Sequence, residues 1–449
     1  MYYIAGYYGK YTTLLDSAQA TNSGQLLFQN TKKYIEGIYM LVDEDKKIVT
    51  EFIMDTNQQY SISLNLTNPE KNIILNSETN TNFFEFNALL KQNNQQIQEL
   101  LKQLEQTTSE KDIKSIKSKI RELNNTIDSY KHNYIKRDPK NVISLLFKLS
   151  QPIESYFNNI ENPSILKNRI DSLNYVKNSY FKGIDFSDSR LLRNPFFETK
   201  INTYFNSFVI QTDEEITKEI FAILDKTGSR ENDVFSYLSL YFMNTYANPK
   251  IMGLDRIFIN IYNKYFQQQE YSWMSTIQKL SLKNIQRDLK DNLIGNISRN
   301  LFMKTIHDER IDLYDVKAPY IVLIFWDPSC GHCLKEIPKI KKIYDDLWKA
   351  INIKIFAVNI NVDLNEDWKK IIKQENLEDW INVYPSDTVT GNYTQEDVDF
   401  QTLFNVHQTP VLYLLDVNKK IIAKQVAVEK YIDIIKNIDS ISSEKLKDN

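Results

Sequence analysis

The hydrophobic pattern changes period twice along the 449-residue chain, and this limits the chain to a multidomain architecture. In residues 1–78 apolar and polar positions alternate in short runs such as GQLLFQN, GIYMLVD and KIVTEFIMD. From residue 79 the apolar positions recur at helical spacing, and after residue 295 strand-like and helical segments alternate. A period of two is typical of strands, and a period of about 3.6 is typical of helices. We therefore predict a multidomain α+β chain with an antiparallel β-domain at 1–78, an all-α domain at 79–295 and an α/β domain at 296–449.

The all-α domain is expected to begin with a helical hairpin. Apolar residues share one helix face from Phe83 to Leu104 and another from Ile113 to Tyr134. Ser109 between them is a candidate N-cap, because a serine side chain can accept a hydrogen bond from a backbone N–H in the first turn. The helical pattern then continues over residues 213–227, 231–247, 252–268 and 271–292.

The α/β domain shows strands and helices in alternation. The expected elements are a strand at Tyr320–Trp326, a helix from Cys333 to about Lys349, a strand at Ile353–Asn359, a helix at Trp368–Glu375, a long connection, strands at Val411–Leu415 and Ile421–Ala423, and a terminal helix from Val428. Such alternation predicts a sheet with a parallel core and a late antiparallel hairpin.

The charge pattern argues against several classes of partner. The net charge of −3 arises from 55 basic and 58 acidic residues that are mixed along the chain. Without a basic block, nucleic acid is not an expected partner. No apolar run approaches the roughly 18 residues that a membrane span needs, and the start MYYIAGYYGKY has neither the cationic nor the apolar region of an export signal.

Both cysteines of the chain, Cys330 and Cys333, lie in the stretch FWDPSCGHCLKEIP. They follow a predicted buried strand and precede a helix, where unpaired backbone N–H groups and the helix dipole favour a thiolate. Cys330 is therefore the expected nucleophile, and Cys333, one turn further into the fold, suits a resolving thiol. Gly331 and His332 lie between them, and a histidine beside the thiolate makes such a pair more oxidising.

Other uses of a close cysteine pair fit the surrounding sequence less well. A structural disulfide here would close a loop of about four residues and gain little chain entropy. Haem attachment needs a histidine directly after Cys333, where Leu334 stands, and a peroxidatic cysteine needs different neighbours. Zinc needs further ligands, but there is no second C-x-x-C, and no ligand spacing is formed by His132, His307, His332 and His407. No metal or cofactor is predicted, since flavin and nicotinamide motifs are absent as well.

The segments FWDPSCGHCLKEIPKIKKIYDDL and VHQTPVLYLLDVNKKIIAK resemble thioredoxin-fold proteins of the TlpA/ResA type in order and spacing. The resemblance implies that Cys330 and Cys333 are the redox pair, with Trp326 four residues before the nucleophile. It also implies that Pro410, after Thr409, is the cis-proline that faces the active site. The alternatives to these roles are simpler: Trp326 would only line the site as a packing residue, and Pro410 would be an ordinary trans proline at the start of a strand.

The same resemblance suggests a candidate proton acceptor. Glu336 matches an acidic residue that assists proton transfer in ResA-like reductants, and Ile324 stands where thioredoxin has a buried aspartate. The alternative is that Glu336 is only an acidic residue near a helix start, which interacts weakly with the dipole. His407 is expected to be a surface or packing residue rather than a catalyst.

The resemblance extends upstream. GYYGKYTTLLDSA and the runs after it are similar to DUF4369, which comes first in many Bacteroidetes thiol-disulfide proteins. YFKGIDFSDSRLLRNPFFETKINTYF and IMGLDRIFINIYNKYF resemble DUF5106. Such proteins are usually found in the periplasm or cell envelope. Met1 falls inside the first β-domain of this pattern, so a further strand and an export signal are expected upstream.

The leading expectation is a thiol-disulfide oxidoreductase that exchanges disulfides with envelope proteins. The resemblance implies protein disulfide or dithiol substrates and a membrane thiol donor of electrons, and the upstream domains would choose partners or form a homodimer. The direction stays open, because the Gly-His spacer favours an oxidant and Glu336 favours a reductant. The alternative is an envelope protein-binding or scaffold module with a regulatory or vestigial redox pair.

Overall fold

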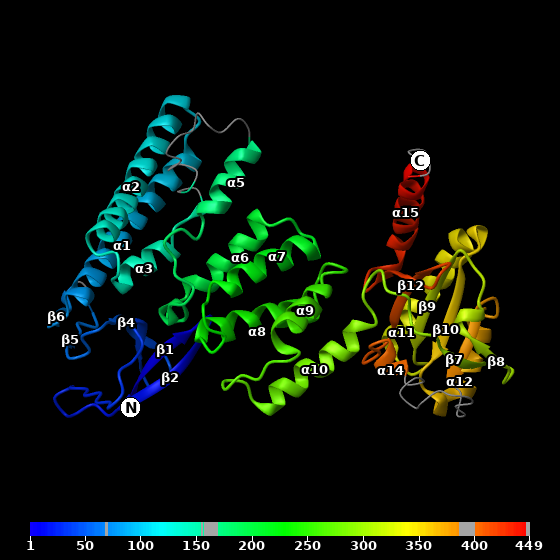
Figure 1. Cartoon of the computed structure of the whole chain (residues 1–449). Helices are drawn as coiled ribbons and strands as arrows, with labels where there is room; N and C mark the ends of the chain where they lie inside the picture. Colours follow the sequence, from blue (N-terminus) through cyan, green and yellow to red (C-terminus); the bar gives the residue numbers. More distant parts are fainter. Residues whose placement is uncertain (68–70, 154–155, 157–168, 386–399, 446–449) are drawn as a thin grey trace. The chain divides into compact units, whose positions relative to one another are not determined.

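The computed structural model describes residues 1–67, 71–153, 156, 169–385 and 400–445 (Figure 1). The chain falls into two compact units. Unit 1 consists of Met1–Gln211 and Lys218–Ser239, and unit 2 consists of Thr212–Thr217 and Leu240–Asn449. This division does not follow the three predicted domains, whose boundaries at residues 78 and 295 stay predictions.

Unit 1 contains a four-stranded antiparallel sheet in the order β2-β1-β3-β4. Its strands are β1 (Tyr2–Tyr8), β2 (Tyr11–Ala18), β3 (Gly37–Val42) and β4 (Ile48–Met54). A separate pair is formed by β5 (Ser61–Ser63) and β6 (Ile73–Leu75).

One predicted strand in this region is wrong. The run GQLLFQN, residues 24–30, forms no strand, although its side chains alternate between half-buried and exposed. Leu26 and Phe28 pack against the cluster that contains Tyr39 and Phe52, whereas Leu27 is exposed. The alternation therefore reflects side-chain packing on the sheet without backbone pairing.

Helices of unit 1 follow the sheet. The predicted hairpin is formed by α1 (Glu78–Gln106) and α2 (Glu110–Arg137), and Ser109 caps α2 by accepting a hydrogen bond from the N–H of Asp112 at 3.4 Å. Next come α3 (Val142–Leu149), α5 (Arg169–Ser179), a 3-10 turn at Ser189–Leu192 and α6 (Phe196–Phe208). Helices α7 (Asp213–Asp225) and α8 (Asp233–Ala247) each contribute residues to both units.

The sheet and the helices of unit 1 share one core. Ile38 and Ile53 of the sheet pack in the same cluster as Phe83, Phe86 and Phe147. The side chain of Asn80 forms two hydrogen bonds with the backbone of β4. Its Oδ1 accepts from the N–H of Ile53 at 2.7 Å, and its Nδ2 donates to the Ile53 carbonyl at 2.8 Å, the same two groups that a neighbouring strand would pair with. This shared core explains why the β-domain and the first helices form one unit.

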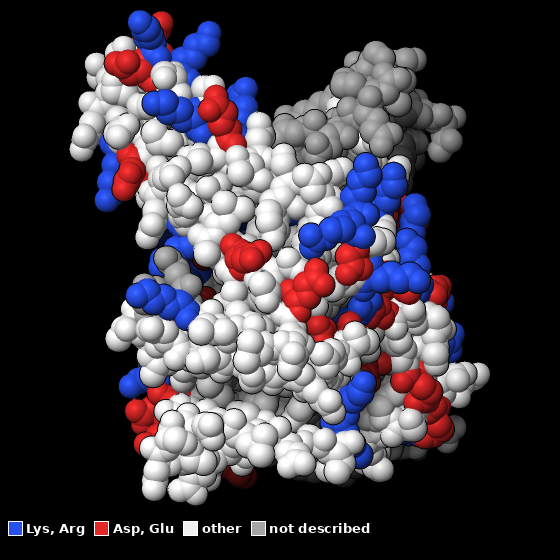
Figure 2. Space-filling view, turned by 90° about the vertical axis from the view of Figure 1, so that its left-hand side faces the viewer, with Lys and Arg blue, Asp and Glu red and all other residues white. Residues whose placement is uncertain are grey.

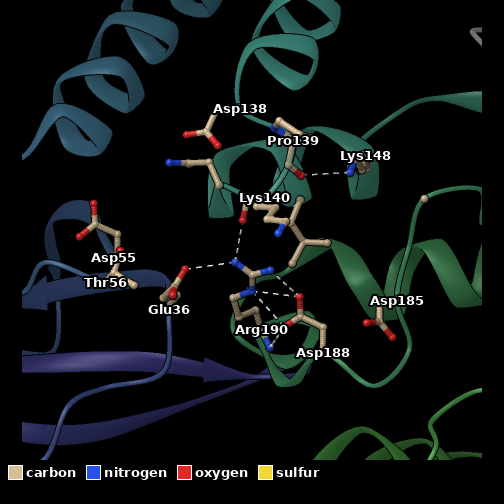
Figure 3. A pocket seen from close by; sticks show the side chains of 13 residues that line it. Glu36, Asp55, Thr56, Asp138, Pro139, Lys140, Lys148, Asp185, Asp188 and Arg190 are labelled. Atoms are coloured by element: carbon tan, nitrogen blue, oxygen red, sulfur yellow. Dashed lines mark hydrogen bonds and ion pairs between the residues drawn. The ribbon is translucent and has the colours of Figure 1, made fainter.

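Two close contacts strengthen this junction. A Cβ atom at Gly37 would lie 2.5 Å from the carbonyl oxygen of Arg193, so only glycine allows this approach. Arg190 donates to Glu36 at 3.1 Å, to the Lys140 carbonyl at 3.0 Å and to Asp188 (Figure 3). The start of β3 is thereby tied to the helices by backbone contact and by charge.

Unit 2 contains a seven-stranded sheet in the order β13-β12-β9-β10-β11-β7-β8. The strands are β7 (Phe302–Thr305), β8 (Arg310–Asp312), β9 (Tyr320–Trp326), β10 (Lys354–Asn359), β11 (Ile381–Pro385), β12 (Val411–Asp416) and β13 (Ile421–Lys424). Strands β9, β10 and β11 are parallel, and the other pairs are antiparallel. The helices are α9 (Arg256–Ile261), α10 (Thr276–Lys290), α11 (Gly331–Ile343), α12 (Asn365–Gln374), α14 (Phe400–Leu403) and α15 (Tyr431–Lys445).

The central strand β9 is apolar throughout because both of its faces are covered. Val322, Ile324 and Trp326 pack in one core, and Leu323 and Phe325 pack in the core on the opposite face. Continuous apolar runs are typical of buried parallel strands. The prediction of a parallel core with a late antiparallel hairpin is confirmed by the pairing.

The last helices of the central region are joined to this sheet. Gly295 donates to the Ile421 carbonyl at 2.8 Å, Ile421 donates to the Asn296 carbonyl at 2.8 Å, and Ser298 donates to the Lys419 carbonyl at 2.8 Å. The linker at 295–298 therefore pairs with the first residue of β13 and with the turn before it. The buried Lys424 of β13 also pairs with Asp255 and donates to the Asn292 carbonyl.

Both signs of charge are interspersed on the face that Figure 2 shows. This agrees with the mixed charge pattern of the sequence. Among the described residues, no helix has the combined length and apolarity that a membrane crossing requires.

Candidate active site

The cysteine pair lies where the central strand passes into the following helix. Strand β9 ends at Trp326, and Cys330 is the N-cap residue of α11, with φ −80° and ψ 114°. The helix begins at Gly331, two residues earlier than predicted, and the N–H of Leu334 donates to the Cys330 carbonyl at 3.0 Å. Cys330 is partly exposed, whereas Cys333 is 0% exposed. The first sulfur can thus meet a partner molecule, and the second lies behind it.

Strand β12 brings the predicted proline to the cysteines. It pairs antiparallel with β9, with Val411 opposite Phe325, so the residues just before β12 lie beside the end of β9. The Thr409–Pro410 peptide bond is cis, as the resemblance implies. The Cys330 Sγ lies 3.5 Å from the Thr409 carbonyl oxygen.

The two thiols differ in acidity. The pKa of Cys330 is lowered, first by a hydrogen bond from the Thr409 side chain and then by the backbone N–H of Cys333. Burial raises the pKa of Cys333 to about 11. The thiolate is the nucleophilic form of cysteine, so Cys330 is the more reactive of the pair at neutral pH.

Trp326, Gly331 and His332 surround the pair on different sides. Trp326 is fully buried and belongs to the same core cluster as Cys333, so it closes the site from within. Gly331 and His332 are exposed on the first turn of α11, and a Cβ at Gly331 would have no neighbour within 4 Å. The spacer therefore faces solvent beside the nucleophile.

The structure does not join Glu336 to the thiols. Its carboxylate binds the Lys339 ammonium at 2.6 Å, and no hydrogen bond to either cysteine is found among the described residues. His407 is exposed, and its Nε2 lies 3.1 Å from the Asp288 carboxylate on α10. The role of Glu336 as a base stays a prediction.

Sequence reasoning missed Asp327, which holds the loop before the nucleophile. Its carboxylate accepts hydrogen bonds from the N–H and the hydroxyl of Ser329, both at 2.7 Å, and from the amide of Asn361 at 3.2 Å. Burial alone would raise the pKa of Asp327, but these hydrogen bonds outweigh it and lower the pKa. The Asp-Pro-Ser order of residues 327–329 could have indicated this role, because an aspartate in a turn often accepts a hydrogen bond from the backbone two residues later.

Within the part of the chain that the structure describes, no group of three His, Cys, Asp or Glu side chains is placed to hold a metal ion.

Two family models match the chain. A domain of unknown function (DUF5106) matches residues 88–292, and the AhpC/TSA family matches residues 294–424.

Individual relatives are named as thiol-disulfide oxidoreductases or as a possible thiol-disulfide isomerase. Thiol-disulfide oxidoreductase ResA of Bacillus cereus is 24% identical over 131 residues, which are 29% of this chain and 68% of the relative. ResA of Halalkalibacterium halodurans is 30% identical over 67 residues, which are 15% of this chain and 38% of the relative. The crystal structure of a domain of a possible thiol-disulfide isomerase from Cytophaga hutchinsonii is 36% identical, with a TM-score of 0.30, and the match covers 35% of this chain and 97% of that domain.

These matches assign the two regions at the level of families. The chain carries a DUF5106 domain followed by a thioredoxin-like domain of the AhpC/TSA family, which is related to bacterial thiol-disulfide oxidoreductases.

Proposed function

We propose that this chain is a thiol-disulfide oxidoreductase in which Cys330 attacks and Cys333 resolves. In the reducing direction, the Cys330 thiolate attacks one sulfur of a protein disulfide, a mixed disulfide forms, and the other substrate sulfur leaves as a thiolate. The Cys333 thiolate then attacks the Cys330 sulfur and expels the second substrate thiol. Two electrons and two protons pass to the substrate, and the pair ends as an intramolecular disulfide.

The contrast between the two thiols supports this proposal most. Cys330 is partly exposed at the start of α11 with a lowered pKa, and Cys333 is buried with a pKa of about 11. A low-pKa, accessible cysteine is typical of reactive sites. The buried thiol stays protonated until the mixed disulfide forms, which favours attack in the stated order.

The proposal is tested by replacing Cys333 with serine. The C333S variant should accumulate mixed disulfides through Cys330, because the resolving step is lost. These adducts should appear as dithiothreitol-sensitive bands on non-reducing gels, with a C330S/C333S double variant as control. If the C333S variant forms no adduct with a disulfide-containing protein, the chain is better explained as a binding or scaffold module.

The finer assignments rest on the family resemblance. We propose protein substrates in the periplasm or cell envelope, a membrane thiol as electron donor, and a partner-selecting or homodimer-forming role for the upstream region, which we assign to DUF4369. The direction of exchange follows from the reduction potential of the pair. A value near −270 mV, about that of thioredoxin, would make the protein a reductant, and one between about −120 and −180 mV would make it an oxidant or isomerase.

A further inference from the structure

A cavity of about 690 Å³ in unit 1 has a strongly basic lining. It is formed by α5, the turn that follows it, α6 and the part of α7 from Lys218 onward. Among the described residues, four lysines line it, Lys177, Lys182, Lys218 and Lys226, together with one carboxylate, that of Glu219. The chain as a whole has a net charge of −3, so a local excess of positive charge is not expected from its composition.

The carboxylate that the described residues contribute to the cavity, that of Glu219, is already bound. Glu219 pairs with the Lys177 ammonium at 2.6 Å and accepts a hydrogen bond from the Tyr204 hydroxyl at 2.8 Å. Lys182 and Lys226 are exposed, and neither forms an ion pair with a described residue. Like charges that share a cavity repel each other, and a bound anion would relieve this repulsion.

The rest of the lining suits the organic part of a ligand. The ring of Tyr204 is buried, stacks on Tyr180 at 5.7 Å between centroids and lies 4.7 Å from the ring of Phe181. Asn174 and Asn178, one turn apart on α5, add side-chain amides to the lining. The cavity therefore combines cations, amides and a fixed aromatic wall, within the size range of small-molecule sites.

A second cavity of unit 1 gives a contrast of similar size, about 640 Å³ (Figure 3). Carboxylates outnumber cations in its lining, and its guanidinium, that of Arg190, is bound to Asp188, Glu36 and the Lys140 carbonyl. Its lysines, Lys140 and Lys148, offer a matched control because they belong to the same unit in an acidic setting.

We propose that the basic cavity binds a phosphate-bearing ligand, whose phosphate contacts Lys182 and Lys226 and whose organic part lies against Tyr204. This site goes beyond the redox function and does not depend on the cysteines. The phosphate could belong to a soluble ester or to a phospholipid headgroup, and both sources present the same charge.

The test uses the full chain and inorganic pyrophosphate in isothermal titration calorimetry at constant ionic strength. The K182Q/K226Q variant should weaken binding about tenfold or more, because two charge-assisted contacts are lost. The K140Q/K148Q variant removes the same charge and should change the dissociation constant by less than about twofold. Lys182, Lys226 and Lys140 are exposed and Lys148 is half-buried, so matching circular dichroism spectra are needed to show that both double variants fold.

Vesicles with and without phosphatidic acid distinguish the two sources. Binding of pyrophosphate without vesicle binding indicates a soluble ester, and sedimentation with phosphatidic acid vesicles that K182Q/K226Q abolishes indicates a lipid headgroup. The proposal is overturned if neither probe binds, or if both double variants weaken binding equally.

Discussion

The sulfur atoms of Cys330 and Cys333 differ in exposure and in acidity, although only two residues separate them. This difference arises from the backbone, since Cys330 is at the helix start and Cys333 is buried in the core cluster that contains Trp326. The sulfur of Cys330 therefore lies near hydrogen-bond donors, and the sulfur of Cys333 lies among apolar side chains. The same helix turn produces a nucleophile and a protected partner.

Alkylation should reveal this difference. With limiting iodoacetamide at pH 7, Cys330 should be modified first, because its pKa is lowered, while the pKa of Cys333 is raised to about 11. In a C330S variant, modification of Cys333 should be at least about tenfold slower than that of Cys330 in C333S. Peptide mass spectrometry measures both rates. Equal rates would contradict the assignment of nucleophile and resolving thiol.

Lys200 is a second residue with an unusual environment. It is 2% exposed, its Nζ donates to the Tyr156 hydroxyl at 2.8 Å, and it lies 4.2 Å from the centroid of the Tyr180 ring. Among the described residues no carboxylate forms an ion pair with it. Burial lowers the pKa of Lys200 from 10.5 to about 7.

Removing this charge should stabilise the protein. The unfolded state binds more protons between pH 7 and 10.5, so the penalty is complete below pH 7 and disappears as the pH rises toward 10.5. K200M should raise the free energy of unfolding by about 2 to 4 kcal/mol at pH 6 and by much less at pH 10. Urea titrations at both values measure this. The exposed control K119M should change stability by less than about 0.5 kcal/mol, and a pH-independent effect of K200M would contradict the prediction.

At the scale of elements, the loop between β9 and α11 positions the nucleophile. The Asp327 carboxylate accepts three hydrogen bonds, two from Ser329 and one from Asn361. The Asp327 carbonyl also accepts from the N–H of Cys330 at 3.0 Å. The loop thus links the ends of β9 and β10 to the helix start.

Loss of the Asp327 carboxylate should loosen this loop. D327A should lower the free energy of unfolding by about 1 to 2 kcal/mol at pH 7, since three hydrogen bonds are lost. The pKa of Asp327 is lowered in the folded state, so this contribution should be present at pH 7 and lost as the pH falls below about 4. The pKa of Cys330, followed by thiolate absorbance, should rise in D327A. The nearby exposed acid Asp363 provides the control D363A, and equal effects of both variants would argue against a positioning role.

The sequence predicted long, strongly patterned elements better than short ones. The run YIVLIFW marked β9 because both faces of that strand are buried, and the 3.6-residue pattern marked the α1–α2 hairpin. Strands β7, β8 and β11 were missed, since they have three to five residues and pair with the sheet through contacts distant in sequence. β11 lies in the segment that was predicted only as a long connection, and residues 386–399 of this segment lie outside the described residues.

The candidate site was predictable where a motif carries the chemistry. Cys330, Cys333 and Pro410 follow from local sequence and resemblance, and the structure brings them together through the β9–β12 pairing. Asp327 was missed although its two hydrogen bonds from Ser329 are local, and only its third partner, Asn361, comes from another loop. The Lys339 partner of Glu336 was also not predicted, although it is only three residues away.

At the scale of the whole molecule, the thioredoxin-like domain is bonded to the last part of the central helical region. Lys424 and Asp255 are 5% and 3% exposed and pair with each other inside unit 2. K424M should lower the free energy of unfolding by about 3 to 5 kcal/mol, because Asp255 would stay buried and uncompensated. K424M/D255N should recover at least half of this loss in denaturant titrations. A double variant as unstable as K424M would show that packing, not charge, dominates here.

The linker at 295–298 also affects how far one edge of the seven-stranded sheet is exposed to other chains. An open strand edge offers unpaired backbone groups to any other chain and invites edge-to-edge aggregation. Residues 295–298 pair with the start of that edge at β13, and the opposite edge, β8, is three residues long with charged residues at both ends. A fragment that begins after Ser298 would leave the start of β13 unpaired on this side, and we expect it to self-associate more than a fragment that begins at Leu240.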